Sequence, residues 1–193
     1  MSLPLAANII LWFLFFILVV LPFGYLIYSI VVYRLIRVPF VATPKKYLTK
    51  IVSILGHELA EKKDLVIYDL GCGTGDFIWA FEEIYGDKIK RIVGVEFSPL
   101  LIFYAKIKAH FKKSTAIFLQ QDFFNVNLSD ADLIYLFLVP TVLEQVWQKI
   151  IKEGKSGLLI GVLSSPIPKV DYEKAVELKI ANQVASRLYL YRL

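Results

Sequence analysis

The sequence contains very few cysteine and histidine residues. Among its 193 residues there are one cysteine, Cys72, and two histidines, His57 and His110. A single cysteine excludes an intrachain disulfide framework and any zinc site built from several thiolates. Two histidines so far apart in the sequence do not predict a histidine cluster. We therefore expect no metal ion in this protein.

Charged residues are missing from the first part of the chain. No Lys, Arg, Asp or Glu precedes Arg34, so all 22 basic and 17 acidic residues lie in positions 34–193. The 14 Phe, 11 Tyr and 3 Trp residues exclude a disordered chain. The charged part is long enough for one domain with a hydrophobic core and too short for two.

The uncharged segment, residues 1–33, predicts a transmembrane anchor, because about 20 consecutive apolar residues can cross a bilayer as a helix. Pro22 and Gly24 lie in the middle of this run, and we expect a kink there. A cleaved signal peptide fits poorly, because the run lacks a basic start and a small-residue cleavage site before the charges begin. A buried core helix is disfavoured, because the run is apolar on all faces.

Basic residues follow the uncharged segment at once, and none precedes it. They are Arg34, Arg37, Lys45, Lys46 and Lys50. The positive-inside rule places the charged body on the cytoplasmic side of a bacterial inner membrane, or in the equivalent position on the inner mitochondrial membrane of a eukaryote. These residues suit the anionic headgroups of a lipid bilayer. No basic stripe is interleaved with stacking aromatic residues, so nucleic acid is not expected as a partner.

The body alternates between two patterns of apolar residues. Runs typical of strands occupy residues 65–70, 91–97, 115–119, 133–138, 157–163, 175–180 and 187–193. Patterns typical of amphipathic helices occupy residues 44–61, 77–85, 99–108 and 140–153. The last two strands are joined by a short link and should pair in the antiparallel sense.

This order predicts a Rossmann-like α/β fold in residues 64–193: a doubly wound, seven-strand sheet with an antiparallel C-terminal strand. One N-terminal transmembrane helix precedes it, followed by a juxtamembrane linker and a helix in residues 34–63. In such a sheet the ligand binds at the carboxyl ends of the strands beside the switch point, here 65–70 and 133–138.

A glycine-rich loop, Asp69 to Asp76, follows the first predicted strand. Its spacing is G-x-G-x-G, which differs from the G-x-G-x-x-G of dinucleotide-binding loops and lacks the Gly-Lys-Ser/Thr of a P-loop. The two acids would repel a pyrophosphate and favour a cationic ligand. Further on, Glu96 ends the second strand, where a carboxylate can accept both hydroxyls of a ribose. Asp122 follows the third strand, where an acid can accept from an adenine amino group and Phe123 can pack on the ring.

Taken together, residues 64–138 resemble a class I, seven-strand S-adenosylmethionine-dependent methyltransferase. The loop DLGCGTG is similar to the first motif of that family, VGVEFSP to the second and QQDFF to the third. The resemblance implies S-adenosyl-L-methionine as the cofactor. It also implies which residues hold each part of it: Asp69, Gly71, Gly73 and Gly75 the methionine moiety, Glu96 the ribose, and Asp122 with Phe123 the adenine.

A narrower resemblance covers nearly the whole chain. The order of the uncharged segment, VPFVATP, the methyltransferase core, ADLIYLFLVP and SSPIP is similar to that of small membrane-anchored protein-lysine methyltransferases. Those enzymes modify ATP synthase subunit c and the adenine nucleotide translocase in mitochondria, and they have bacterial relatives. The loop of this chain departs from the DLGSGDG of the mitochondrial members. The resemblance implies an integral membrane protein as substrate.

A lysine acceptor must lose its proton, and a dry aromatic pocket lowers its pKa. The residues expected to line such a pocket are Phe40, Tyr135 and Phe137, with Thr43 as a helix N-cap that can also face the pocket. Core packing is the alternative role for each aromatic residue. The fourth strand lacks the Asn/Asp-Pro-Pro-aromatic sequence that acts on planar amides and amino-purines. A methyltransferase for a quinone or lipid, and a non-catalytic cofactor-binding module, remain alternatives.

Overall fold

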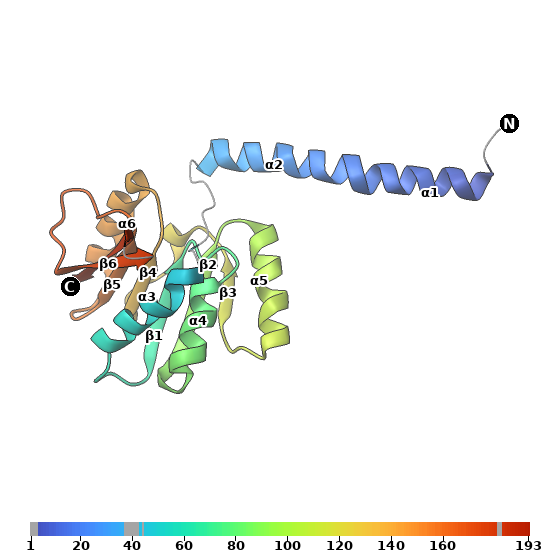
Figure 1. Cartoon of the computed structure of the whole chain (residues 1–193). Coiled ribbons are helices and arrows are strands. Elements are labelled where there is room, and N and C mark those ends of the chain that lie inside the picture. Colours follow the sequence, from blue (N-terminus) through green and yellow to red (C-terminus); the bar gives the residue numbers. More distant parts are fainter. Residues whose placement is uncertain (1–3, 37–42, 44, 181–182) are drawn as a thin grey trace. The chain divides into compact units, whose positions relative to one another are not determined.

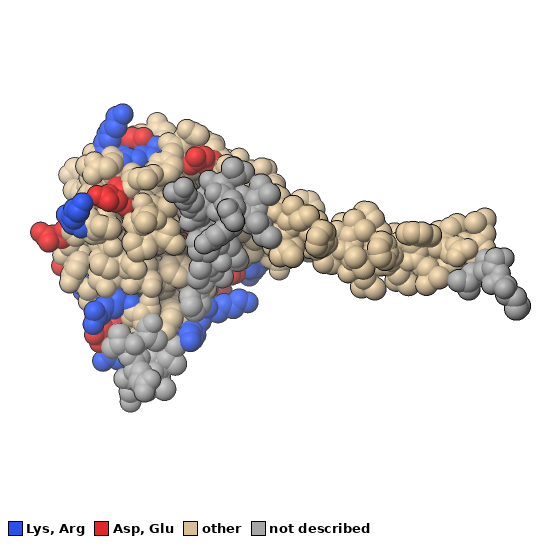
Figure 2. Space-filling view, turned by 90° about the horizontal axis from the view of Figure 1, so that it is seen from above, with Lys and Arg blue, Asp and Glu red and all other residues tan. Residues whose placement is uncertain are grey.

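The computed structural model describes residues 4–36, 43, 45–180 and 183–193, and the chain divides into two compact units, Met1–Pro39 and Phe40–Leu193 (Figure 1). In the first unit, helix α1 (Leu5–Phe15) continues through a π-helical turn, η1 (Phe16–Val20), into helix α2 (Leu21–Ile36). The 24 residues of Leu5–Tyr28 contain an 18-residue window with a mean hydropathy of 2.7, so this stretch is long and apolar enough to cross a membrane. It carries no charged side chain, whereas both signs are scattered over the visible face of the second unit (Figure 2).

The irregular turn in the apolar helix lies just before the position where we expected a kink. In η1 the N–H of Leu21 donates to the carbonyl of Phe16, five residues earlier. Pro22 has no N–H to donate, and its ring clashes with the carbonyl four residues before it, that of Leu18, in a regular α-helix. The wider turn contains Leu18 and accommodates Pro22 without ending the helix.

The second unit contains a seven-stranded sheet in the order β3-β2-β1-β4-β5-β7-β6 (Figure 1). The strands are β1 (Leu65–Leu70), β2 (Ile89–Glu96), β3 (Ile117–Gln120), β4 (Leu133–Leu136), β5 (Leu159–Leu163), β6 (Lys174–Ile180) and β7 (Gln183–Arg192). Strands β1 to β5 are parallel, and β7 runs antiparallel to both β5 and β6. This confirms the predicted doubly wound sheet with an antiparallel end, whose switch point lies between β1 and β4.

The helices of this unit are α3 (Lys45–Glu58), α4 (Asp76–Tyr85), α5 (Pro99–Lys112) and α6 (Pro140–Glu153), with 3-10 turns η2 (Gly86–Lys88) and η3 (Phe123–Asn125). Two glycines let α3 and α4 approach one face of the sheet closely. A Cβ on Gly161 of β5 would lie 2.8 Å from Leu55 of α3, and one on Gly94 of β2 would lie 2.7 Å from Ile78 of α4. Helix α6 packs near the antiparallel end, where Trp147 contacts a ring of β7.

Several element boundaries differ from the sequence prediction by a few residues. Strand β5 begins at Leu159, because Gly157 has a φ of 77° and forms a turn. Helix α5 runs on to Lys112 and ends where Lys113 adopts a left-handed conformation with a φ of 53°. Strand β3 therefore begins at Ile117, later than the apolar pattern indicated.

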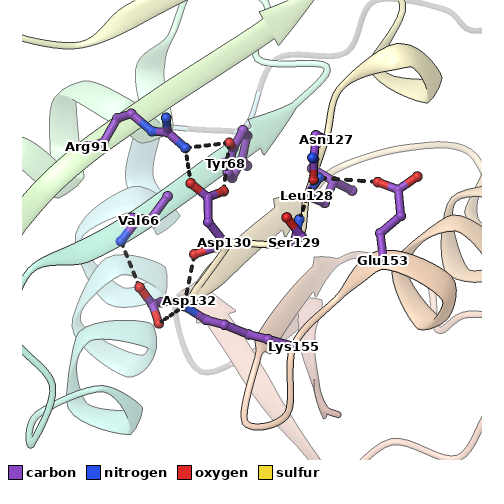
Figure 3. Close-up of polar contacts among 10 residues, drawn as sticks. All are labelled: Val66, Tyr68, Arg91, Asn127, Leu128, Ser129, Asp130, Asp132, Glu153 and Lys155. Carbon is purple, nitrogen blue, oxygen red and sulfur yellow. Dashed lines mark hydrogen bonds and ion pairs between the residues drawn. The ribbon is translucent and has the colours of Figure 1, made fainter.

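A polar network at the amino ends of β1 and β4 holds the segment that connects β3 to β4 (Figure 3). Asp132 accepts the N–H of Val66 at 2.9 Å and forms ion pairs with Lys155 at 2.8 Å and Lys62 at 3.6 Å. Desolvation is the largest influence on the pKa of Asp132 and raises it. The hydrogen bonds from Lys155 and Val66 and the charges of both lysines outweigh it, so the pKa is lowered overall.

Next to this carboxylate, Asp130 joins β1 and β2 through side chains (Figure 3). It accepts from the hydroxyl of Tyr68 at 3.0 Å and forms an ion pair with Arg91, which also donates to the Tyr68 oxygen at 2.8 Å. Burial and the hydrogen bond to Asp130 raise the pKa of Tyr68 to about 12, so the phenol stays protonated and donates. These contacts are structural, because they lie at the edge of the sheet opposite to the predicted site.

We expect Asp132→Asn to destabilise the fold at neutral pH by about 1–3 kcal/mol, because the carboxylate that accepts a hydrogen bond from Lys155 and pairs electrostatically with Lys62 is lost. A lowered carboxyl pKa in the folded state contributes stability above the unfolded pKa, and this contribution is lost as the pH falls through the folded pKa. Urea unfolding in detergent should therefore give a lower free energy of unfolding for the variant than for wild type at pH 7. This difference should disappear in acid. The exposed Asp171→Asn is the control. A difference in the free energy of unfolding that stays constant with pH would contradict a stabilising role for the ionised Asp132 carboxylate.

Candidate functional site

The predicted cofactor residues lie at the carboxyl ends of three adjacent strands. Asp69 is in β1, in register with Gly94 of β2. Glu96 is the last residue of β2, in register with Gln120 at the end of β3, and Asp122 lies two residues after β3. The structure thus brings the three carboxylates of Asp69, Glu96 and Asp122 to one edge of the sheet, beside the switch point.

The glycine loop between β1 and α4 needs left-handed backbone at three positions. The φ angles of Gly71, Gly73 and Gly75 are 82°, 54° and 81°, a region that side chains with a Cβ rarely adopt. The N–H of Gly71 donates to the carbonyl of Val95 at 2.8 Å, which fastens the loop to β2. This conformation explains the G-x-G-x-G spacing.

Glu96 connects the glycine loop to the start of α5. Its Oε2 accepts the N–H of Gly73 at 3.2 Å, and its Oε1 accepts the N–H of Ser98 at 2.8 Å. Each carboxylate oxygen has two lone pairs, so each retains capacity for one more donor. Two neighbouring oxygens held in this way fit a pair of hydroxyl groups such as those of a ribose.

Asp69 is 4% exposed, and no residue in the described part of the chain donates a hydrogen bond to its carboxyl. Burial, followed by the charges of Glu96 and Asp76, raises the pKa of Asp69 well above its usual range. A cationic group near Asp69 would stabilise the ionised carboxylate. Asp76 is less available than its sequence position indicated, because Lys108 forms an ion pair with it at 3.0 Å. The attraction for a positive ligand therefore rests on Asp69 and Glu96.

Asp122 and Phe123 form the third part of the edge. The Oδ1 of Asp122 accepts the N–H of Phe124 at 2.9 Å, which caps the turn η3. Phe123 is partly buried, and the centroid of its ring lies 4.8 Å from the centroid of the Phe124 ring. The capping bond fixes the carboxylate beside an aromatic ring, an arrangement that fits a flat heterocycle with an amino group.

Tyr135 of β4 is in register with Asp69 on the other side of β1. Its ring is buried and stacks on that of Phe77, with centroids 4.0 Å apart and planes at 11°. Its hydroxyl is hydrogen-bonded to Oγ1 of Thr43 at 3.1 Å. Burial raises the pKa of Tyr135 above its ordinary value, so the phenol cannot act as a base at neutral pH.

The other two aromatic or neighbouring positions expected to line an acceptor pocket are Phe137 and Phe40. Phe137 follows β4 and is partly buried against the hydrophobic core, so packing accounts for much of its surface. Phe40 lies outside the described residues. No sequence pattern predicts the bond between Thr43 and Tyr135, because the two residues are 92 positions apart.

We expect Gly75→Ala to destabilise the protein by about 2–4 kcal/mol, the combined cost of a left-handed alanine and of overpacking. A Cβ at Gly75 would lie 2.9 Å from the ring of Phe118 and 3.1 Å from that of Trp79, and these two rings pack together. Gly86→Ala is the matched control, because no atom lies within 4 Å of its added Cβ and its φ is −54°. Urea unfolding of both variants checks this, and equal stability would contradict the packing argument.

Comparisons with known proteins agree with this geometry. The ANTKMT methyltransferase domain matches residues 69–174, more than half of the chain. A protein-lysine N-methyltransferase of Saccharolobus islandicus is 32% identical over 123 residues, which cover 63% of this chain and 73% of that protein.

Solved structures show the same fold. An RNA methyltransferase of Salinibacter ruber, in complex with S-adenosyl-L-homocysteine, has 24% identity and a TM-score of 0.67 over 79% of this chain and 93% of its own. The rRNA methyltransferase aviRa of Streptomyces viridochromogenes has 10% identity and a TM-score of 0.61 over 79% and 86%.

These findings confirm a methyltransferase with S-adenosyl-L-methionine as its cofactor, and they disfavour a non-catalytic module. The match begins at Asp69, at the carboxyl end of β1, and ends at Lys174, the first residue of β6. It therefore spans the glycine loop and all three strand ends that carry the carboxylates. The chain belongs to the family of the ANTKMT methyltransferase domain.

Proposed function

We propose that this protein is a membrane-anchored protein-lysine N-methyltransferase that modifies an integral membrane protein. The observation that carries the proposal is the gathering of Asp69, Glu96 and Asp122 at one sheet edge in a chain that also has an apolar helix, Leu5–Tyr28. The similarity to a protein named as a protein-lysine N-methyltransferase supports lysine as the acceptor.

In this proposal each part of the site holds one part of the cofactor. The glycine loop and Asp69 hold the cationic methionine end, Glu96 holds the ribose, and Asp122 with Phe123 holds the adenine. S-adenosyl-L-methionine supplies a methyl group that its sulfonium already activates. The protein then contributes alignment and the exclusion of water.

The acceptor amine must be neutral, although a free lysine has a pKa of about 10.4. An apolar aromatic environment disfavours the ammonium form and lowers that pKa. The stacked rings of Tyr135 and Phe77 are buried in the core next to Asp69, so they can make its surroundings apolar without themselves touching the acceptor. The bond between Thr43 and Tyr135 holds Thr43 at this strand. Thr43 is thereby a candidate for the acceptor side of the site.

A lipophilic small molecule, such as a quinone or a lipid headgroup, is the second candidate acceptor, because an anchor serves it equally well. Tritiated S-adenosyl-L-methionine, incubated with the full chain and membranes from a deletion strain, separates the two. Label recovered as methyl-lysine after acid hydrolysis supports the protein acceptor. Label that is extracted entirely by organic solvent would contradict it.

The same proposal predicts the orientation in the membrane. Basic residues such as Arg34 and Lys45 follow the apolar helix and none precedes it, so Ser2 should lie outside and the methyltransferase unit inside. Protease added to intact cells should leave residues 40–193 intact, whereas the same protease after detergent lysis should digest them. Digestion in intact cells would reverse the orientation.

A further inference from the structure

The exposed side of helix α5 is apolar, which is unusual for a helix at the surface of a domain. The residues of this α5 stripe are Leu100, Phe103, Tyr104, Ile107 and Phe111, at helical spacing. Phe111 is 80% exposed and Phe103 is 63% exposed, whereas Ile102 and Ala105 face the core on the opposite side. A contiguous exposed patch of this kind marks a surface that contacts a partner.

Within the segment that contains the stripe the charges are all of one sign, although Glu82 and Glu83 of α4 line a pocket together with Lys112. Residues 97–121 contain four lysines and no aspartate or glutamate. Lys108 is already paired with Asp76, but Lys106 and Lys112 are exposed. At 100° per residue, Lys106 lies on one side of the stripe and Lys112 on the other. A row of aromatic and aliphatic side chains between cationic margins complements a surface with an apolar interior and anionic headgroups.

A bilayer with this chemistry is within reach of α5 if the proposed anchoring holds, and the inference rests on that part of the proposed function. Nine peptide steps separate Ile36, the last residue of α2, from Lys45, the first of α3. Fully extended, they span no more than about 33 Å. The membrane that holds the N-terminal helix is thus present at high effective concentration. We propose that the α5 stripe lies in the headgroup region of that bilayer.

Contact through α5 has a direct consequence for the site. Ser98 is the N-cap of helix α5: its N–H donates to Glu96 at 2.8 Å, and its side chain accepts from the N–H of Leu101. The first turn of α5, where the stripe starts, therefore adjoins Glu96, the candidate for binding the ribose. A stripe that rests on the membrane holds the carboxyl edge of the sheet close to the headgroups, where a lysine at the end of a membrane span can enter.

The test measures the surroundings of the stripe in the full-length protein. Phe111→Cys carries an environment-sensitive fluorophore, and Gln148→Cys on α6 is the matched control, since both positions are exposed. Cys72 is buried, and burial raises the pKa of its thiol well above the usual range, so it reacts poorly with the label. In vesicles of phosphatidylcholine and phosphatidylglycerol in equal parts, emission at position 111 should shift to the blue. Spin-labelled lipids should quench it there and not at position 148.

Two further variants sharpen the result. Phe103→Ser with Ile107→Ser, and Lys106→Glu with Lys112→Glu, should each reduce quenching at position 111 several-fold. Both should raise KM for a membrane-embedded acceptor and leave the Kd for S-adenosyl-L-methionine unchanged. If the protein floats with the vesicles but position 111 behaves like position 148, the stripe does not contact lipid, and the anchoring stands. If the protein does not float, the anchoring fails as well. A blue shift that requires another protein, or that grows with protein concentration in detergent, would assign the stripe to a protein partner.

Discussion

Glu96→Ala should weaken the binding of S-adenosyl-L-methionine by about 30- to 1000-fold. Two charge-assisted hydrogen bonds to the ribose would be lost, which corresponds to roughly 2–4 kcal/mol. The N–H groups of Gly73 and Ser98 would also lose their acceptor, so the glycine loop would be held less firmly. Isothermal calorimetry on the full-length protein in detergent measures the effect.

Two variants serve as controls for this measurement. Glu96→Gln keeps one carbonyl oxygen for Ser98 or a hydroxyl and loses the negative charge, so its affinity should fall between those of wild type and Glu96→Ala. Glu83→Ala removes an exposed glutamate from α4 and should bind like wild type. An unchanged Kd for Glu96→Ala, with the fold intact by circular dichroism, would remove Glu96 from the cofactor site.

Deletion of residues 1–33 should leave the Kd for S-adenosyl-L-methionine unchanged, because the deleted residues belong to the first unit and the cofactor candidates to the second. Methylation of acceptor in intact membranes should fall by roughly 10- to 100-fold, because the tether no longer concentrates the enzyme at the bilayer. Rates with labelled cofactor on membranes, compared between the truncated and full-length proteins, measure this loss.

The same two proteins on a detergent-solubilised acceptor provide the internal control. There the difference should be small, because the acceptor is no longer confined to a bilayer. Equal rates on intact membranes would show that the apolar helix only localises the protein. A loss of cofactor binding in the truncated protein would show that the first unit also supports the fold of the second.

Much of the fold, and the gathering of the candidate cofactor residues at one edge of the sheet, could be predicted from the sequence because local chemistry determines them. Gly71, Gly73 and Gly75 mark left-handed backbone, and the apolar runs mark strands covered on both faces. The carboxyl ends of parallel strands meet at one edge, so Glu96 and Asp122 were placed correctly without a model of the side chains. These features need only neighbouring residues and the handedness of the crossover connections.

Contacts between distant segments could not be predicted in the same way. The pairing of Asp76 with Lys108 depends on how α4 and α5 pack, and it removes an acid that the sequence assigned to ligand attraction. The bond between Thr43 and Tyr135 depends on where the segment before α3 meets β4. The exposure of the α5 stripe also depends on how distant segments pack. The sequence shows apolar residues on every side of that helix, and only the packing identifies which of them remain exposed.

Mass spectrometry of membrane proteins from cells with and without this gene tests the central claim most directly. The strains to compare are the deletion strain and the same strain complemented with wild type or with Glu96→Ala. We predict methyl-lysine on an integral membrane protein, near the end of a span on the same side as residues 40–193. It should be present with wild type and absent from both the deletion strain and the Glu96→Ala strain. Gene-dependent methyl-lysine on soluble proteins alone, or gene-dependent methylation of lipid with none on lysine, would contradict the account.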